Sequence, residues 1–356
     1  MKPLYVILLS MCSQYLAAQL YDKTWVCGSY AGILDFNQSS IDTFAYVPHI
    51  ALAYESASIC DSNGELQFFT EGVNVYSNDG IAMPNGNSLS DETVNTQHND
   101  GLPDDQNVLI LPKLGNKYYI IYQSQSDFAY ANEPWYYTDN LYYSVVDMEQ
   151  QGGKGDVTQK RVLVNSNRFM DGKMTACQHA NGRDWWLVQR RYNANSYFIY
   201  LVTPDGITFK SEQFIGAVSS EPDAIGQSAF SPDGTKYATI TGKSPLIILD
   251  FDRCEGMFSN PRKVAIPMDT FQFYNQTAIM GGGNGLCFSP NSRFIYINSN
   301  FILRQYDLSE NPIDSSEEVI FFWTDSNEYL GQFNQMHLGP DGKVYSANYQ
   351  GFTEAL

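Results

Sequence analysis

The chain has 356 residues and a formal net charge of −18, because 39 acidic side chains outnumber 21 basic ones. A negative field of this size repels phosphate backbones and anionic lipid. It therefore disfavours nucleic-acid binding and indicates either a solubilising surface or an acidic groove for a cationic partner. A hydrophobic content of 43% excludes a disordered chain. Abundant Tyr and Phe, without a long helical period, favour an all-β fold.

Residues 1–18 are predicted to be a signal peptide. Lys2 precedes an apolar run that ends at Leu16, and small residues follow as far as Ala18, near which we expect cleavage. No later segment approaches the roughly 18 apolar residues of a membrane-spanning helix. We therefore expect a secreted or cell-surface protein with no membrane span.

A turn followed by an alternating strand recurs through residues 19–356. In its clearest copy, Ser231–Gly234, Pro presets one backbone angle, Asp bonds to the nearby backbone and Gly accepts a positive φ. The predicted turn positions are Gly64, Gly115, Gly182, Gly234, Asn291 and Gly342. They lie 51 to 67 residues apart, and a four-stranded blade takes roughly 40–50 residues. This spacing predicts a single domain, an all-β β-propeller of about six or seven four-stranded blades.

The last copy of the repeat lies close to the end of the sequence. Too few residues follow the strand predicted at 343–348 to complete a four-stranded blade, since strands have about five residues each. We therefore expect an incomplete last blade and a domain that is truncated at its C-terminal side. The ring is expected to have one blade thin or missing, or to be closed only by the strand pair predicted at Thr24–Phe36.

Five cysteines remain once the signal peptide is removed. Their number is odd, and their spacing matches no zinc-binding motif. Cys60, Cys177 and Cys287 occupy equivalent strands before the turn, where they are expected to pack as small buried residues. A disulfide is possible in an oxidising compartment, but the sequence does not determine which cysteines would pair.

No catalytic constellation is visible, so no catalytic residue is predicted. The mature chain contains the histidines His49, His98, His179 and His337. None lies in a nucleophile elbow or a metalloprotease helix. His179 and His337 occupy repeat strands, and we expect them to form hydrogen bonds within their blades.

Two loops have compositions that are typical of a metal site or a phosphate-binding loop, but neither has the required residue spacing. Asn99–Asp105 is rich in acidic residues but lacks the spacing and the closing Glu of an EF-hand, so no metal is predicted. Gly281–Gly285 lacks the following Lys and Ser or Thr of a phosphate-binding loop, so no cofactor is predicted.

Aromatic clusters are the sequence feature with binding potential. Trp135, Tyr136 and Tyr137 lie in a long insertion between two blades, at residues 123–140. Exposed aromatic side chains on loops stack on sugars or anchor protein partners, so these three are the predicted binding residues. The alternative is that they fill gaps between blades, which is the expected role of the adjacent pair Trp185–Trp186.

Several segments together resemble the secreted WD-repeat-like propeller proteins of Bacteroidetes. They are Trp25–Phe36, Glu55–Gly72, Leu141–Val157, His179–Trp186 and Asp250–Cys254. The resemblance covers roughly residues 22–350. It implies a propeller fold, export by type IX secretion, a cell-surface location and no particular reaction. Such propellers commonly precede a sorting domain or a gliding-motility-associated C-terminal domain, and neither is found within residues 1–356.

The predicted function is therefore a non-enzymatic binding or scaffold module for a protein or glycan at the cell surface. The alternative is a propeller hydrolase or lyase whose dispersed acidic residues act from the central channel, since a fold does not settle function. A third interpretation is that the propeller serves only as a spacer for a C-terminal module. Two carboxylates and a histidine meeting at one mouth of the channel would favour the enzyme.

Overall fold

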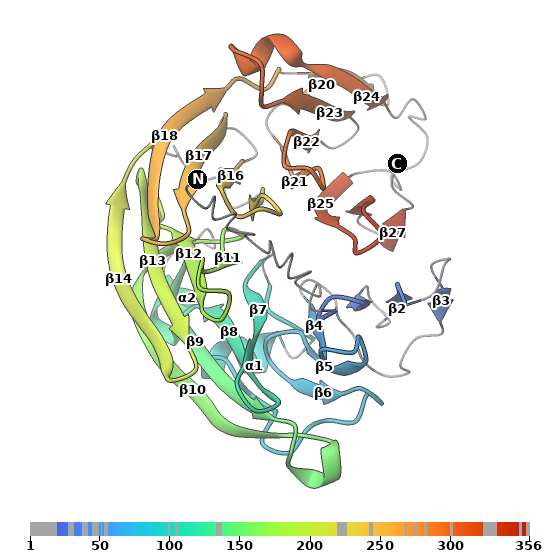
Figure 1. Cartoon of the computed structure of the whole chain (residues 1–356), viewed down its shortest axis with the longest axis vertical. Coiled ribbons are helices and arrows are strands. Elements are labelled where there is room, and N and C mark those ends of the chain that lie inside the picture. Colours follow the sequence, from blue (N-terminus) through green and yellow to red (C-terminus); the bar gives the residue numbers. More distant parts are fainter. Residues whose placement is uncertain are drawn as a thin grey trace, which may run out of the picture.

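The computed structural model is an all-β propeller, with its sheets arranged around a common centre (Figure 1). The residues that it describes are 20–27, 32–37, 42–44, 50, 52, 56–98, 100–103, 106–132, 137–218, 226–241, 245–267, 269–273, 276–280, 283–299, 302–322, 333–348 and 351–353. The sheets follow one another around the ring in chain order, so the first and the last lie side by side.

Within the described residues, the seven antiparallel sheets that have three or four strands are numbered 1 to 7 in chain order. Sheet 1 contains β1 (Thr24–Cys27), β2 (Gly32–Asp35) and β3 (Asp42–Phe44), and sheet 2 contains β4 (Ala57–Cys60), β5 (Leu66–Thr70) and β6 (Val75–Ser77). Sheet 3 contains β7 (Val108–Lys113), β8 (Lys117–Ser124), β9 (Tyr137–Asp147) and β10 (Asp156–Met170). Sheet 4 contains β11 (Thr175–Gln178), β12 (Trp185–Arg190), β13 (Ser196–Thr203) and β14 (Gly206–Phe214).

The second half continues the same pattern. Sheet 5 contains β15 (Ser228–Phe230), β16 (Lys236–Thr239), β17 (Leu246–Asp252) and β18 (Met257–Val264). A hairpin of β19 (Asp269–Phe273) and β20 (Gln276–Met280) precedes sheet 6, which contains β21 (Gly285–Phe288), β22 (Phe294–Ser299), β23 (Ile302–Asp307) and β24 (Glu318–Phe322). Sheet 7 contains β25 (Phe333–Leu338), β26 (Val344–Asn348) and β27 (Gly351–Thr353). The short helices are α1 (Glu92–Gln97), α2 (Asp127–Asn132), η1 (Gln151–Gly153) and η2 (Ile313–Ser316).

The prediction of an all-β propeller is confirmed, but the predicted number of six or seven four-stranded blades is not. Within the described residues, only sheets 3, 4, 5 and 6 have four strands, and sheets 1, 2 and 7 have three. The repeat spacing could not show this, because the interval between two turns counts residues and not the strands that they form.

Apolar side chains are buried between neighbouring sheets. One cluster joins Val188 and Tyr197 of sheet 4 to Tyr237 and Leu249 of sheet 5. Comparable clusters lie between sheets 2 and 3, 3 and 4, and 5 and 6. Central strands such as β17 are consequently buried on both faces. A single sheet has no core of its own, so the ring supplies the burial that stabilises each sheet.

In each of sheets 2 to 7, the turn between the first and second strands is called the inner turn. These inner turns have the backbone conformation that the repeat predicts. The glycines in five of them have φ between +69° and +88°, and they are Gly64, Gly115, Gly182, Gly234 and Gly342. In sheet 6 the residue with positive φ is Ser292 (+57°), so the predicted position Asn291 is wrong by one residue. Asn291 instead accepts the Ser289 hydroxyl at 2.6 Å, as Asp233 accepts that of Ser231.

Replacement of Gly234 tests how tightly these turns are packed. A Cβ at Gly234 would lie 2.7 Å from Cδ of Arg253, whose Nε bonds to the Gln178 carbonyl of the neighbouring sheet. We expect Gly234→Val to lower the free energy of unfolding by about 2–3 kcal/mol, through backbone strain and this clash. Gly115 has φ +75° and nothing within 4 Å of its Cβ position, so Gly115→Val should cost about 1 kcal/mol. Equal losses in chemical denaturation would contradict the Arg253 contact.

Two glutamine side chains connect different sheets of the ring. Gln227, which is 2% exposed, accepts the backbone N–H groups of Leu286 and Met336 and donates to the Met336 carbonyl. Gln106 exchanges two hydrogen bonds with the Ser228 backbone, at 2.9 Å each. Gln227 precedes sheet 5 and bonds to sheets 6 and 7, whereas Gln106 precedes sheet 3 and bonds to sheet 5.

Three of the five described cysteines are buried, as predicted. Cys60 is inaccessible, Cys177 is 7% exposed and Cys287 is 5% exposed. Burial raises the pKa of the Cys177 thiol to about 12, and that of Cys287 to about 12, which keeps both thiols protonated. All five cysteines of the described chain are free thiols.

Candidate ligand-binding site

The three predicted binding aromatics are only partly described. Trp135 and Tyr136 lie outside the described residues. Tyr137 begins β9 and is 3% exposed; its ring packs against Tyr192 at 5.1 Å and under the Arg168 guanidinium at 4.9 Å. Because its ring is covered, Tyr137 fills a gap in the structure, which was the alternative to a binding role. The binding prediction therefore depends on Trp135 and Tyr136.

The three described histidines lie in separate parts of the ring, close to α1, sheet 4 and sheet 7. Nδ1 of His179 accepts the Asn181 N–H at 2.9 Å inside its own turn, as expected, and Nε2 of His98 lies 3.2 Å from the Tyr130 hydroxyl. The ring of His337 lies 6.1 Å from that of Trp25. Among the described residues, no group of three His, Cys, Asp or Glu side chains has the geometry of a metal site. His49 lies outside them.

Glu71 is a buried carboxylic acid that the sequence analysis did not single out. It is inaccessible to solvent, and Oε1 accepts the Asn74 N–H at 2.8 Å and its amide Nδ2 at 2.6 Å. Burial raises the pKa of Glu71 to about 7. Such a pKa suits a general acid or base, but the closed surroundings leave no path to a substrate. Glu71 therefore does not supply the acid that a hydrolase would need.

The buried position of Glu71 predicts a pH-dependent stability. Its folded pKa of about 7 exceeds the value of about 4.3 in an unfolded chain. The wild type is therefore fully stabilised below about pH 4 and loses stability as the pH rises towards 7. Glu71→Gln keeps the acceptor at Oε1, so we expect the variant to match the wild type at pH 4 and to exceed it by about 3–4 kcal/mol at pH 8. A pH-independent difference in urea denaturation would contradict this.

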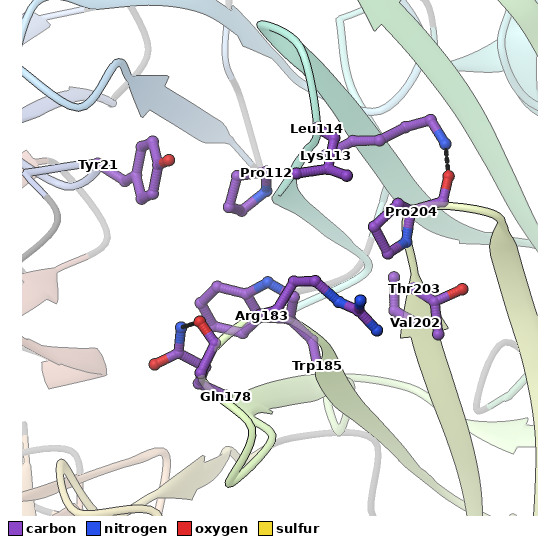
Figure 2. A pocket seen from close by; sticks show the side chains of 11 residues that line it. Tyr21, Pro112, Lys113, Leu114, Gln178, Arg183, Trp185, Val202, Thr203 and Pro204 are labelled. Atoms are coloured by element: carbon purple, nitrogen blue, oxygen red, sulfur yellow. Dashed lines mark hydrogen bonds between the residues drawn. The ribbon is translucent and has the colours of Figure 1, made fainter.

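A pocket of about 150 Å³ lies where sheets 3 and 4 meet, on the side of the ring that carries the inner turns. Its walls come from Pro112–Leu114 at the end of β7, the β11–β12 turn, Val202–Pro204 at the β13–β14 turn, and Tyr21 before β1. Figure 2 shows Tyr21 on one side of the pocket and Pro204 on the other, with Arg183 extending between them. Segments far apart in the sequence thus build one site.

Lys113 forms hydrogen bonds both within sheet 3 and across to sheet 4 at the rim of this pocket. Its Nζ donates to the Tyr119 hydroxyl at 3.0 Å and to the Pro204 carbonyl, a bond drawn in Figure 2. The Tyr119 hydroxyl in turn donates to the Thr203 carbonyl at 3.0 Å. These hydrogen-bonding partners of Lys113 are neutral groups, so they do not cancel its positive charge.

Arg183 is held in a fixed plane by the residue that follows it. Nε and Nη2 donate to the two carboxylate oxygens of Asp184, at 2.8 Å each, and Asn181 Nδ2 donates to Asp184 at 2.7 Å. The hydrogen bonds from Arg183 lower the pKa of Asp184, which is itself only 4% exposed. The Arg183 side chain remains 60% exposed and is one of the residues that line the pocket.

The two adjacent tryptophans have different roles. Trp186 is 3% exposed, stacks on His179 at 5.1 Å and donates from Nε1 to the Arg253 carbonyl at 2.8 Å, so it is the gap-filling residue predicted. Trp185 points to the opposite face of the strand, is only partly buried and lines the pocket. Trp185 nevertheless packs against the apolar cluster between sheets 3 and 4, so the predicted gap-filling role holds in part for Trp185 and fully for Trp186.

Sequence reasoning did not find this pocket. A signal was nevertheless present, because Lys113 and Arg183 flank two repeat turns in a chain that is poor in basic residues, and Trp185 follows one of them directly. The position of Tyr21, which joins the pocket from before the first strand, had no local signal.

Comparison with known proteins gives distant structural matches. No protein-family model and no curated protein matches the chain. Hydrazine synthase of Kuenenia stuttgartiensis is 13% identical over 90% of this chain and 88% of its own, with a TM-score of 0.46. A functionally unknown protein from Desulfotomaculum acetoxidans is 12% identical over 86% and 90%, with a TM-score of 0.42. A proposed 6-phosphogluconolactonase from Bacteroides uniformis is 14% identical over 94% and 93%, with a TM-score of 0.46.

These likenesses are too distant to carry an argument about activity. Nothing in them concerns type IX secretion or gliding motility, so that part of the family resemblance stays an expectation. Among the described residues, no helix is long and apolar enough to cross a membrane.

Proposed function

We propose that this chain is an exported, non-enzymatic propeller that binds a saccharide in the pocket between sheets 3 and 4. The observation that carries the proposal is the partly exposed face of Trp185 in a pocket of about 150 Å³, whose rim is polar. Aromatic rings pack against the apolar face of a sugar ring, while a few placed polar groups bond to its hydroxyls. A pocket of this size suits one sugar ring with its substituents.

Polar groups of the required kinds surround Trp185. The amide nitrogen of Gln178 donates to the Gly182 carbonyl at 2.9 Å, which orients its amide oxygen as an acceptor for a hydroxyl. The Arg183 guanidinium supplies donors. The site lies on inner turns fixed by the ring rather than on a long loop, so a ligand would meet a preformed surface.

We also propose that the ring has seven blades, of which the first, second and last have fewer strands than the others. Contacts between first strands support it, because β1 lies against β4, β4 against β7, β11 against β15, β15 against β21, and β21 against β25. Removal of residues 1–18 as a signal peptide, and a location outside the cell, belong to the same proposal.

Binding to a glycan array followed by calorimetry tests the saccharide proposal. We expect Trp185→Ala to weaken binding of the best glycan at least tenfold, because a stacking face is lost, and Trp185→Phe to retain most of the affinity. Phe128 on α2 is 72% exposed and does not line the pocket, so Phe128→Ala is the control and should bind as the wild type does. A wild-type chain that binds no glycan would contradict the proposal.

A further inference from the structure

The pocket between sheets 3 and 4 holds two basic side chains, although the chain as a whole is strongly acidic. Lys113 and Arg183 are among its lining residues, and no lining residue is acidic. Asp184 and Asp205 stand just outside and interact with Arg183. Asp61 interacts with Tyr21 of the same pocket. The two basic side chains thus line the pocket directly, whereas these three carboxylates stand outside its lining. An anionic group in the pocket would therefore contact the basic side chains first, with the carboxylates farther away.

A guanidinium has two edges that each bind a carboxylate through parallel N–H bonds. Asp184 occupies the edge formed by Nε and Nη2 of Arg183. The edge formed by Nη1 and the second N–H of Nη2 is the one that remains for a ligand. Because Asp184 fixes the plane of the group, little rotamer entropy is lost when that edge is used.

We propose that the ligand is an acidic sugar whose carboxylate is bound by Arg183, with Asp184 as the positioning residue. This inference rests on the proposed saccharide function and names the class of sugar. The ring of the ligand packs on Trp185, its carboxylate lies at the Nη edge of Arg183, and Gln178 accepts a hydroxyl. Lys113 adds a positive charge from the rim.

Sheet 6 supplies a matched control for the Arg183 turn. Arg293 follows the positive-φ residue Ser292, as Arg183 follows Gly182. It also donates to a carboxylate, that of Asp307, through Nε at 3.0 Å and Nη2 at 2.5 Å. Arg293 is comparably exposed, at 54%, and does not line the pocket. Arg293→Gln thus removes an equivalent charge and ion pair elsewhere on the ring.

Calorimetry with paired sugars tests the proposal. The probes are galacturonate and galactose, glucuronate and glucose, and the methyl esters of the two acids. We expect the wild type to bind one acid at least tenfold more tightly than its neutral partner and its ester. Arg183→Gln should remove this preference by weakening binding of the acid more than binding of its neutral partner, and Arg183→Lys should restore part of it. Asp184→Asn should reduce the preference without abolishing it, and Arg293→Gln should behave as the wild type.

The possible failures are distinguishable. Equal binding of acid, ester and neutral sugar would overturn the acidic-sugar inference and leave the proposed function standing. Tighter binding of a galactose sulfate than of galacturonate would also overturn it, since a carboxylate would not be the group recognised. Absence of binding to every sugar would overturn both. Thermal melting of the four variants distinguishes lost binding from lost folding, and Arg183→Gln is expected to melt as Arg293→Gln does.

Discussion

Replacing Gln227 with Leu is expected to lower the free energy of unfolding by about 4 kcal/mol. The side chain is 2% exposed, and its three hydrogen bonds, of 2.8 to 3.0 Å, satisfy Leu286 N–H, Met336 N–H and the Met336 carbonyl. Leu has nearly the same size but makes none of these bonds. Each buried backbone group that is left unpaired costs about 1–3 kcal/mol. Urea denaturation of the two proteins measures the difference.

A second substitution at the same position separates the hydrogen bonds from packing. In Gln227→Glu, a protonated carboxyl group can donate to the Met336 carbonyl and accept the two N–H groups, whereas a carboxylate cannot donate. Burial raises the folded pKa of this Glu above its unfolded value of about 4.3. The variant should therefore be close to wild-type stability below pH 4 and lose stability as the pH rises through the folded pKa. A variant equally unstable at pH 4 and pH 8 would contradict the assigned bonds.

The sequence predicted the fold class because the turn chemistry is local. Positive φ at Gly234 and Gly342, and the hydroxyl bonds of Asp233, depend only on residues next to one another. The number of strands in each sheet did not follow, since it depends on how the ring packs. The error at Asn291 has the same origin, because Asn and Ser are adjacent in that turn and only the backbone shows which of them has positive φ.

The candidate site could be predicted less well than the fold. Its residues come from four separate segments, and neither Tyr21 nor Pro204 carries a local pattern that points to a pocket. Trp135–Tyr137 were predicted to bind a ligand because aromatic residues on an insertion are often exposed. In the structure, Arg168 and Tyr192 cover the ring of Tyr137. Exposure is set by tertiary packing, which composition alone does not determine.

Phe36 lies where the first and last sheets of the ring meet. Phe36 is 6% exposed and lies 4.8 Å from the ring of Trp25 and 5.5 Å from that of Tyr345 in sheet 7. Trp25 lies 5.5 Å from Tyr345 as well. Among the described residues, sheets 1 and 7 share no strand, so aromatic packing joins the two ends, as the expected closure by Thr24–Phe36 requires. We expect Phe36→Ala to cost about 3–5 kcal/mol of stability.

Phe258 is the matched control for this prediction. It is 7% exposed and packs between sheets 4 and 5, with its ring 5.2 Å from that of Tyr197 and 5.2 Å from that of Tyr237. Phe258→Ala should cost a similar free energy, but its effect on hydrogen exchange should be local to sheets 4 and 5. Phe36→Ala should instead raise exchange in β1, β2, β25 and β26 together, since each pair of strands loses the surface that covers it. If β25 and β26 keep their protection while β1 and β2 lose theirs, the aromatic cluster does not close the ring.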